Sequence, residues 1–271
     1  MTRQFQNNLF QLCKEDQKFS EYITKIPDLE ECPHNEIINE NFKRITMDSL
    51  FRSPSLDILV NIEHQSQISN AIMFRNLKYF VTTKDKHQKE VKQYIFYTGK
   101  NPVPTWYIYD EQVYHHPYLK QTCLYDGLET FKNIKDKINN NQYISPFDIY
   151  DLVWLPCFGK IETDNKFLKE YINIISKLKT HKYYYLLEKA VFGWSMKINP
   201  DKEIIEYLKE KFDMIPIDSP EFKEFLTSAI NERELEKKDE IIAEKDEIIN
   251  EKDEMINKLK KELEKHTNEK K

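Results

Sequence analysis

The sequence predicts an α/β fold for the N-terminal half of the chain, on three observations. Two β-rich segments on either side of the turn-prone Ser53-Pro54-Ser55 predict a hairpin over residues 43–65. Apolar residues at helical spacing over residues 69–87 predict a helix that packs on a sheet, and a further strand follows at 91–99. With a helical N-terminus, this order of elements is typical of an α/β domain rather than of a β-sandwich.

The other segments of this half are less regular. Residues 5–26 have apolar groups at roughly helical spacing and predict one or two helices, which Pro27 interrupts. Residues 34–42 fit either a short helix or the approach to a strand. The segments 105–116 and 122–128 indicate additional strands.

From about residue 145, long helical patterns replace the strands, and Ser219 followed by Pro220 is a good helix start. We therefore divide the chain into an α/β domain over residues 1–150, a helical subdomain over 151–230 and a charged tail over 231–271.

The tail repeats with a period of seven residues, KDEIIAE, KDEIINE and KDEMINK, which indicates a coiled coil. If Ile241, Ile248 and Met255 occupy heptad position d, however, lysines occupy position a, which weakens the seam. A helix that forms a homo-oligomer and a solvated single helix are therefore equal alternatives.

Composition excludes several classes of protein. The chain has only 4 glycines and no glycine-rich phosphate-binding motif, so a nucleotide-binding fold is not expected. The net charge of −5 gives no global basic surface, so any groove for DNA must be a local arrangement of lysine and arginine. Four scattered cysteines without a C-x-x-C pair argue against a zinc site. The chain lacks an apolar signal core and a run of the ~18 apolar residues that a membrane span needs, so we expect a cytoplasmic protein with no membrane partner.

The second strand of the predicted hairpin carries the candidate chemistry. Side chains alternate along a strand, so one face of residues 56–65 is apolar and the other ends in Glu63 and Gln65. His64 lies on the opposite face and is expected to be structural or exposed. An unpartnered buried carboxylate is costly, so a metal or another cation is expected beside Glu63.

A magnesium site needs a second acid, since the carboxylate oxygens lie about 2.1 Å from the ion. Asp57 shares the face of Glu63, but six residues along a strand span about 20 Å. Asp48 lies on the preceding strand, where hairpin pairing can bring it near Glu63, and it is the better candidate. Gln65 can hold a water or a phosphate oxygen, but as a neutral amide it cannot act as a general base.

An acid on one strand, a hairpin and then E-x-K or E-x-Q on the next strand resemble the core of the PD-(D/E)XK nuclease superfamily. The fuller pattern resembles the Rpn family of recombination-promoting nucleases, also described as putative transposases. The similarity covers roughly residues 5–160, although QNNLFQLCK departs from the H-D-x-x-F-K sequence that the family leads us to expect. The matching elements are Asp48 to Arg52, Glu63 to Ser66, Arg75 to Tyr79 and Tyr97 to Gly99.

The resemblance implies a restriction-endonuclease-like core, a mixed sheet flanked by helices, that cleaves DNA in recombination or mobile elements with Mg²⁺, or Mn²⁺ in its place. Asp48 and Glu63 would be metal ligands, and Gln65 would stand in the position of the superfamily lysine. A glutamate from the preceding segment, Glu40 or Glu36, would complete the site.

Two other interpretations compete with a nuclease. A catalytically inactive nuclease fold could serve as a DNA-binding or protein-interaction module, and a scaffold could depend mainly on the heptads. The charged side chains of Arg75 and Lys78 fit a phosphate contact and a solvated helix face equally well.

Overall fold

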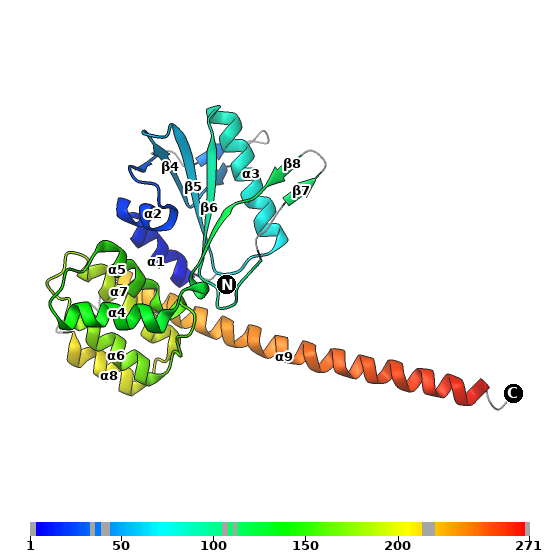
Figure 1. Cartoon of the computed structure of the whole chain (residues 1–271). Helices are drawn as coiled ribbons and strands as arrows, with labels where there is room; N and C mark the ends of the chain where they lie inside the picture. The colour runs from blue at the N-terminus through cyan, green and yellow to red at the C-terminus, as the bar shows by residue number, and fades with distance from the viewer. Residues whose placement is uncertain are drawn as a thin grey trace.

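A five-stranded mixed sheet forms the centre of the computed structural model, which describes residues 4–32, 36–38, 44–104, 108–110, 113–212 and 220–268 (Figure 1). The strand order is β1-β4-β5-β6-β9, antiparallel between β1, β4 and β5 and parallel between β5, β6 and β9. The predicted α/β class is confirmed. The strands are β1 (Glu30–Glu31), β4 (Ser49–Ser53), β5 (Ile58–Gln65), β6 (Val91–Tyr97) and β9 (Tyr118–Gln121).

The predicted hairpin is formed by β4 and β5, which pair from Ser53 opposite Ile58 to Ser49 opposite Ile62. All eight residues of β5 are buried, because helices cover both faces of the strand. The turn between the two strands contains Asp57 in the left-handed conformation, with φ of 49°.

Helix α3 (Asn70–His87) connects the parallel strands β5 and β6 and covers one face of the sheet (Figure 1). It begins where the Ser69 side chain accepts a hydrogen bond from the Ile72 backbone N–H at 3.3 Å. The helix predicted over 69–87 is therefore confirmed. A small apolar cluster lies on this side of the sheet and consists of Met47, Leu50, Leu59, Tyr79 and Val91.

The opposite face of the sheet packs on α1 (Gln4–Lys14) and α2 (Gln17–Thr24). The aromatic rings of Phe10, Phe96 and Trp154 join this layer to the helices that follow the sheet. One large apolar cluster therefore runs from the sheet into the helical part of the chain. The predicted domain boundaries stay predictions.

The helical part lies below the sheet in Figure 1 and starts before residue 145. Helix α5 begins with a capping box, in which Ser145 and Asp148 each bond the other residue's backbone N–H. The helices are α4 (Gly127–Asn139), α5 (Pro146–Trp154), α6 (Asn165–Ser176), α7 (Tyr184–Ile198), α8 (Lys202–Lys211) and α9 (Pro220–Asn268).

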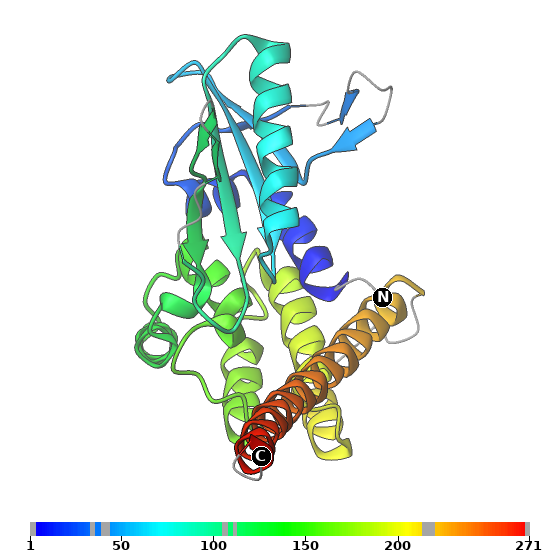
Figure 2. The ribbon, with the colours of Figure 1, turned by 90° about the vertical axis from the view of Figure 1, so that its right-hand side faces the viewer.

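Helix α9 is 49 residues long and crosses the body before it projects into solvent (Figures 1 and 2). Its first turns pack against α1 and α7. Within the residues that the structure describes, no helix has the length and apolar character required to span a bilayer.

Two small antiparallel ribbons accompany the main sheet: β2 (Glu36–Ile38) with β3 (Arg44–Thr46), and β7 (Ile108–Asp110) with β8 (Val113–His115). The strand predicted over 122–128 is wrong. Thr122–Leu124 forms a 3₁₀ turn, and α4 starts at Gly127 because the Asp126 side chain caps it by accepting from the Glu129 N–H.

Candidate active site

Asp48 and Glu63 meet at the open end of the β4–β5 ladder. Ser49 pairs with Ile62, and one further step of this antiparallel register sets Asp48 opposite Glu63. The Asp48 backbone N–H donates to Glu63 Oε1 at 3.2 Å, and the His64 backbone N–H donates to Asp48 Oδ2 at 2.9 Å. Each carboxylate is thus held by the backbone of the opposite strand.

Burial of this pair disfavours its charged form. Glu63 is 2% exposed and Asp48 is half-buried. Burial, followed by the nearby charge of Asp48, raises the pKa of Glu63 well above its ordinary value. Burial also raises the pKa of Asp48, although the His64 N–H and the positive charges of Arg75 and Lys14 oppose this shift. Without a cation, the two acids therefore tend to retain a proton.

Two cationic side chains approach the pair from different helices. At the end of α1, Lys14 Nζ donates to the Asp48 backbone oxygen at 2.8 Å. Arg75 on α3 is exposed, and its charge lowers the pKa of both Asp48 and Glu63. The two carboxylates therefore lie beside positive charge from two helices.

A buried amide network supports Glu63 from behind. Asn61 Nδ2 donates to Glu63 Oε1 at 3.3 Å, and Gln93 Nε2 donates to Asn61 Oδ1 at 3.2 Å and to the Asn76 backbone oxygen at 2.9 Å. Asn76 is fully buried, and its side-chain amide has no hydrogen-bond partner among the described residues. These bonds fix the orientation of the Glu63 carboxylate.

Gln65 is the last residue of β5, two positions after Glu63 on the same face. Its backbone is fixed, because its oxygen accepts from the Thr98 N–H at 3.0 Å and the residue pairs with Tyr97. Within the described part of the chain, its side-chain amide makes no hydrogen bond. The residue is 8% exposed.

The third acid stays unassigned. Glu40 lies outside the described residues. Glu36 pairs with Thr46 of β3, close in sequence to Asp48. Among the described residues, no group of three or more metal-binding side chains occurs.

His64 points to the other side of the sheet, into the core. Its Nδ1 lies 2.6 Å from Asn7 Oδ1, its Nε2 lies 2.9 Å from Thr98 Oγ1, and its ring stacks on Phe10. Burial lowers the pKa of His64 to about 3, so the ring is neutral at physiological pH. The geometry fits a structural role.

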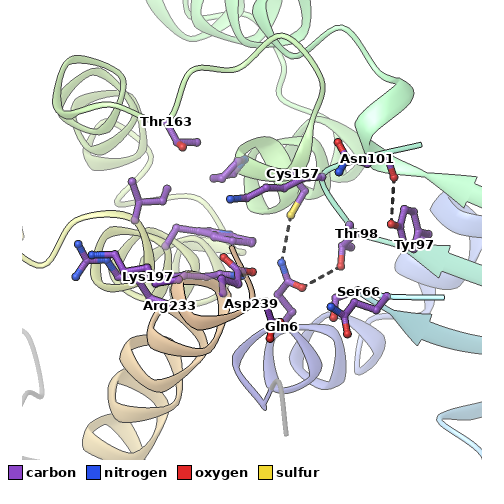
Figure 3. A pocket seen from close by; sticks show the side chains of 18 residues that line it. Gln6, Ser66, Tyr97, Thr98, Asn101, Cys157, Thr163, Lys197, Arg233 and Asp239 are labelled. Carbon is purple, nitrogen blue, oxygen red and sulfur yellow. Dashed lines mark hydrogen bonds and ion pairs between the residues drawn. The ribbon is translucent and has the colours of Figure 1, made fainter. Parts of the chain in front are cut away.

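A pocket of about 400 Å³ lies beyond the carboxyl ends of β5 and β6, bounded by Ser66, Thr98 and Trp194 (Figure 3). Asp48 and Glu63 do not line it. Its Lys197 is paired with Glu232 at 2.7 Å and with Glu236 at 2.9 Å. The charge at this position is thus already neutralised by the attachment of α9.

Sequence reasoning missed Lys14 and Asn61. Nothing in the sequence signals Lys14, because its proximity to Asp48 depends on how α1 crosses the sheet. Asn61 had a signal, since it stands between Val60 and Ile62 in an apolar strand and shares a face with Glu63.

The fold and the paired acids define an α/β protein with a two-carboxylate site at the edge of a β-hairpin. The chain belongs to the family described as putative transposase, YhgA-like, whose model matches residues 16–190. This match confirms the resemblance to the Rpn family and associates the chain with mobile elements. No curated protein and no solved structure matches the chain.

Proposed function

We propose that the chain is a Mg²⁺-dependent DNA endonuclease of mobile elements, with Asp48 and Glu63 as metal ligands. The observation that carries this proposal is the convergence of a buried and a half-buried carboxylate from neighbouring strands, with the pKa of each raised. Such a pair binds a proton or a cation, because two adjacent buried negative charges repel each other.

The donors fit magnesium. Mg²⁺ is commonly held by one or two carboxylates, with waters and substrate phosphates completing its octahedron. Glu40 or Glu36 is proposed as an additional ligand, and Mn²⁺ is expected to substitute. A bound ion would supply Lewis-acid activation of the phosphodiester and of the attacking water.

The chain's own residues would orient the reactants. Gln65 is proposed to position the attacking water or a phosphate oxygen through its unengaged amide. Arg75, exposed beside the acids, would bind the phosphate of the DNA, and Lys14 would hold the Asp48 backbone in place. These roles need no global basic surface.

The test compares Glu63→Gln and Asp48→Asn with Asp57→Asn, which removes an exposed charge at the far end of the same hairpin. We expect the first two variants to lose Mg²⁺-dependent nicking of supercoiled plasmid at least about 100-fold, since they remove metal ligands. Asp57→Asn should retain it. Undiminished nicking by Glu63→Gln would refute the assignment.

A second candidate is a catalytically inactive DNA-binding or interaction module. Two observations favour this module. The carboxylates of Asp48 and Glu63 already accept hydrogen bonds from the backbone of the opposite strand, and a neutral Gln65 stands in the superfamily lysine position. Calorimetry separates the two functions. Binding of Mg²⁺ or Mn²⁺ that Glu63→Gln abolishes supports the nuclease, and absence of binding at millimolar metal supports the module.

A further inference from the structure

The far part of α9, residues 237–268, is a helical stalk (Figure 1). Every residue from 241 to 258 is solvent-exposed. Exposed fractions range from 47% to 65% for six large apolar residues of this segment: Ile241, Ile242, Ile248, Ile249, Met255 and Ile256. Contiguous exposed apolar surface of this kind marks an interaction site.

The repeat determines the shape of that surface. A straight α-helix has 3.6 residues per turn, so residues that repeat every seven positions form a stripe that winds slowly around the helix. Two such helices keep their stripes in contact along their length only if they wind around each other in a left-handed supercoil. Three consecutive heptads, 238–258, keep this period, which is about the minimum length that indicates a coiled coil.

A different heptad register from the one that places Ile241 at d moves the lysines from position a to position d. With Ile242, Ile249 and Ile256 at position a, the preceding Ile241, Ile248 and Met255 occupy g. In the sequence, Leu259 and Leu263 then stand at d and a. β-Branched residues at a, combined with leucine at d, favour two-stranded parallel coils, and here leucine stands at d at position 259.

In this register each lysine of the seam has an aspartate of the partner helix beside it. Lysine occupies d at 238, 245 and 252, and aspartate occupies the next position, e, at 239, 246 and 253. In a parallel pair, side chains at g flank the partner's a, and side chains at e flank the partner's d. Apolar g therefore meets apolar a. Each lysine at d lies opposite the partner's lysine at d, and the partner's aspartate at e, beside it, offsets part of that repulsion.

We propose that the stalk pairs with the stalk of a second copy of this chain as a parallel, in-register, two-stranded coiled coil. The occupant is a second copy because the same residues provide both halves of the apolar seam and both signs of charge. The base of α9 is fixed to the body, since Glu232 accepts from the backbone N–H groups of Phe5 and Gln6 at 3.0 and 3.2 Å. Pairing would therefore set the spacing of two bodies, whether or not they cleave DNA.

The first experiment measures mass by sedimentation over a wide range of protein concentrations. We expect the full chain to be a dimer, and the double variant Ile249→Glu/Ile256→Glu to be a monomer. The control Asn250→Glu/Asn257→Glu places the same charges one position later, on the outer face, and should remain a dimer. A monomeric full chain, or equal behaviour of the two double variants, would overturn the proposal.

The second experiment tests orientation by disulfide formation. Ile242→Cys and Ile256→Cys should each cross-link with themselves under mild oxidation, because equal positions meet in a parallel in-register pair. The unsubstituted chain, with Cys13, Cys32, Cys123 and Cys157, gives the background. Cross-linking only when the two variants are mixed would show an antiparallel pair and overturn the parallel form.

Discussion

At the scale of single residues, burial disfavours the charged forms of the two acids in the candidate site. Glu63 and Asp48 both have a raised pKa, with burial as the largest cause. The folded state therefore binds protons more tightly than the unfolded chain between the ordinary and the raised pKa values. Over that window the free energy of unfolding falls as pH rises, and it is highest below the ordinary carboxylate pKa.

Glu63→Gln should therefore stabilise the metal-free protein at neutral pH by about 2 kcal/mol, because it removes a buried charge while Gln Oε1 can still accept from Asn61 and the Asp48 N–H. The difference from the parent protein should shrink toward pH 4. Urea unfolding in a chelator at several pH values measures it. A variant that is less stable than the parent at pH 7 would contradict the proposed repulsion.

At the scale of elements, the sequence pattern predicted the helices and strands that are determined by residues close together in the chain. The hairpin, α3 and β6 followed from alternation, helical spacing and turn residues, and the hairpin register accounts for the meeting of Asp48 and Glu63. The course of α1 across the sheet did not follow, since tertiary packing decides it. For this reason Lys14 was not predicted to lie beside Asp48.

The attachment of α9 also depends on contacts between distant residues. Glu232 is 1% exposed, accepts from the first N–H groups of α1 and pairs with the buried Lys197 of α7. The open N–H groups of a helix N-terminus favour a negative charge. One carboxylate thus joins three helices from the two ends and the middle of the chain.

Glu232→Ala should lower the free energy of unfolding by about 3 kcal/mol, since it leaves a buried lysine underpaired and two backbone N–H groups without an acceptor. Glu236→Ala, which removes the second and partly exposed partner of Lys197, should cost less than about 1 kcal/mol. Chemical denaturation of both variants gives the comparison. Equal losses would show that Glu232 has no special role.

For the whole molecule, the predicted tail combines two physically different parts. Its start belongs to the body, since Glu232 is buried, as are Ser228 and Ala229 just before the tail, whereas every residue from 241 to 258 is exposed. The tail composition alone did not separate these parts, because the charge pattern near Glu232 resembles that of the heptads.

Two truncations separate the parts. A chain that ends after Asp239 retains Glu232 and Glu236, so its melting temperature should match that of the full chain at low protein concentration, where coil pairing contributes least. A chain that ends after Asn231 loses the cap of α1 and the partners of Lys197, and it should melt roughly 5–10 °C lower. Calorimetric scans of the three chains measure this, with sedimentation to show that both truncated chains are monomers. If the chain ending after Asn231 melted with the full chain, α9 would not be part of the body, and the stalk could not hold two bodies at a set spacing.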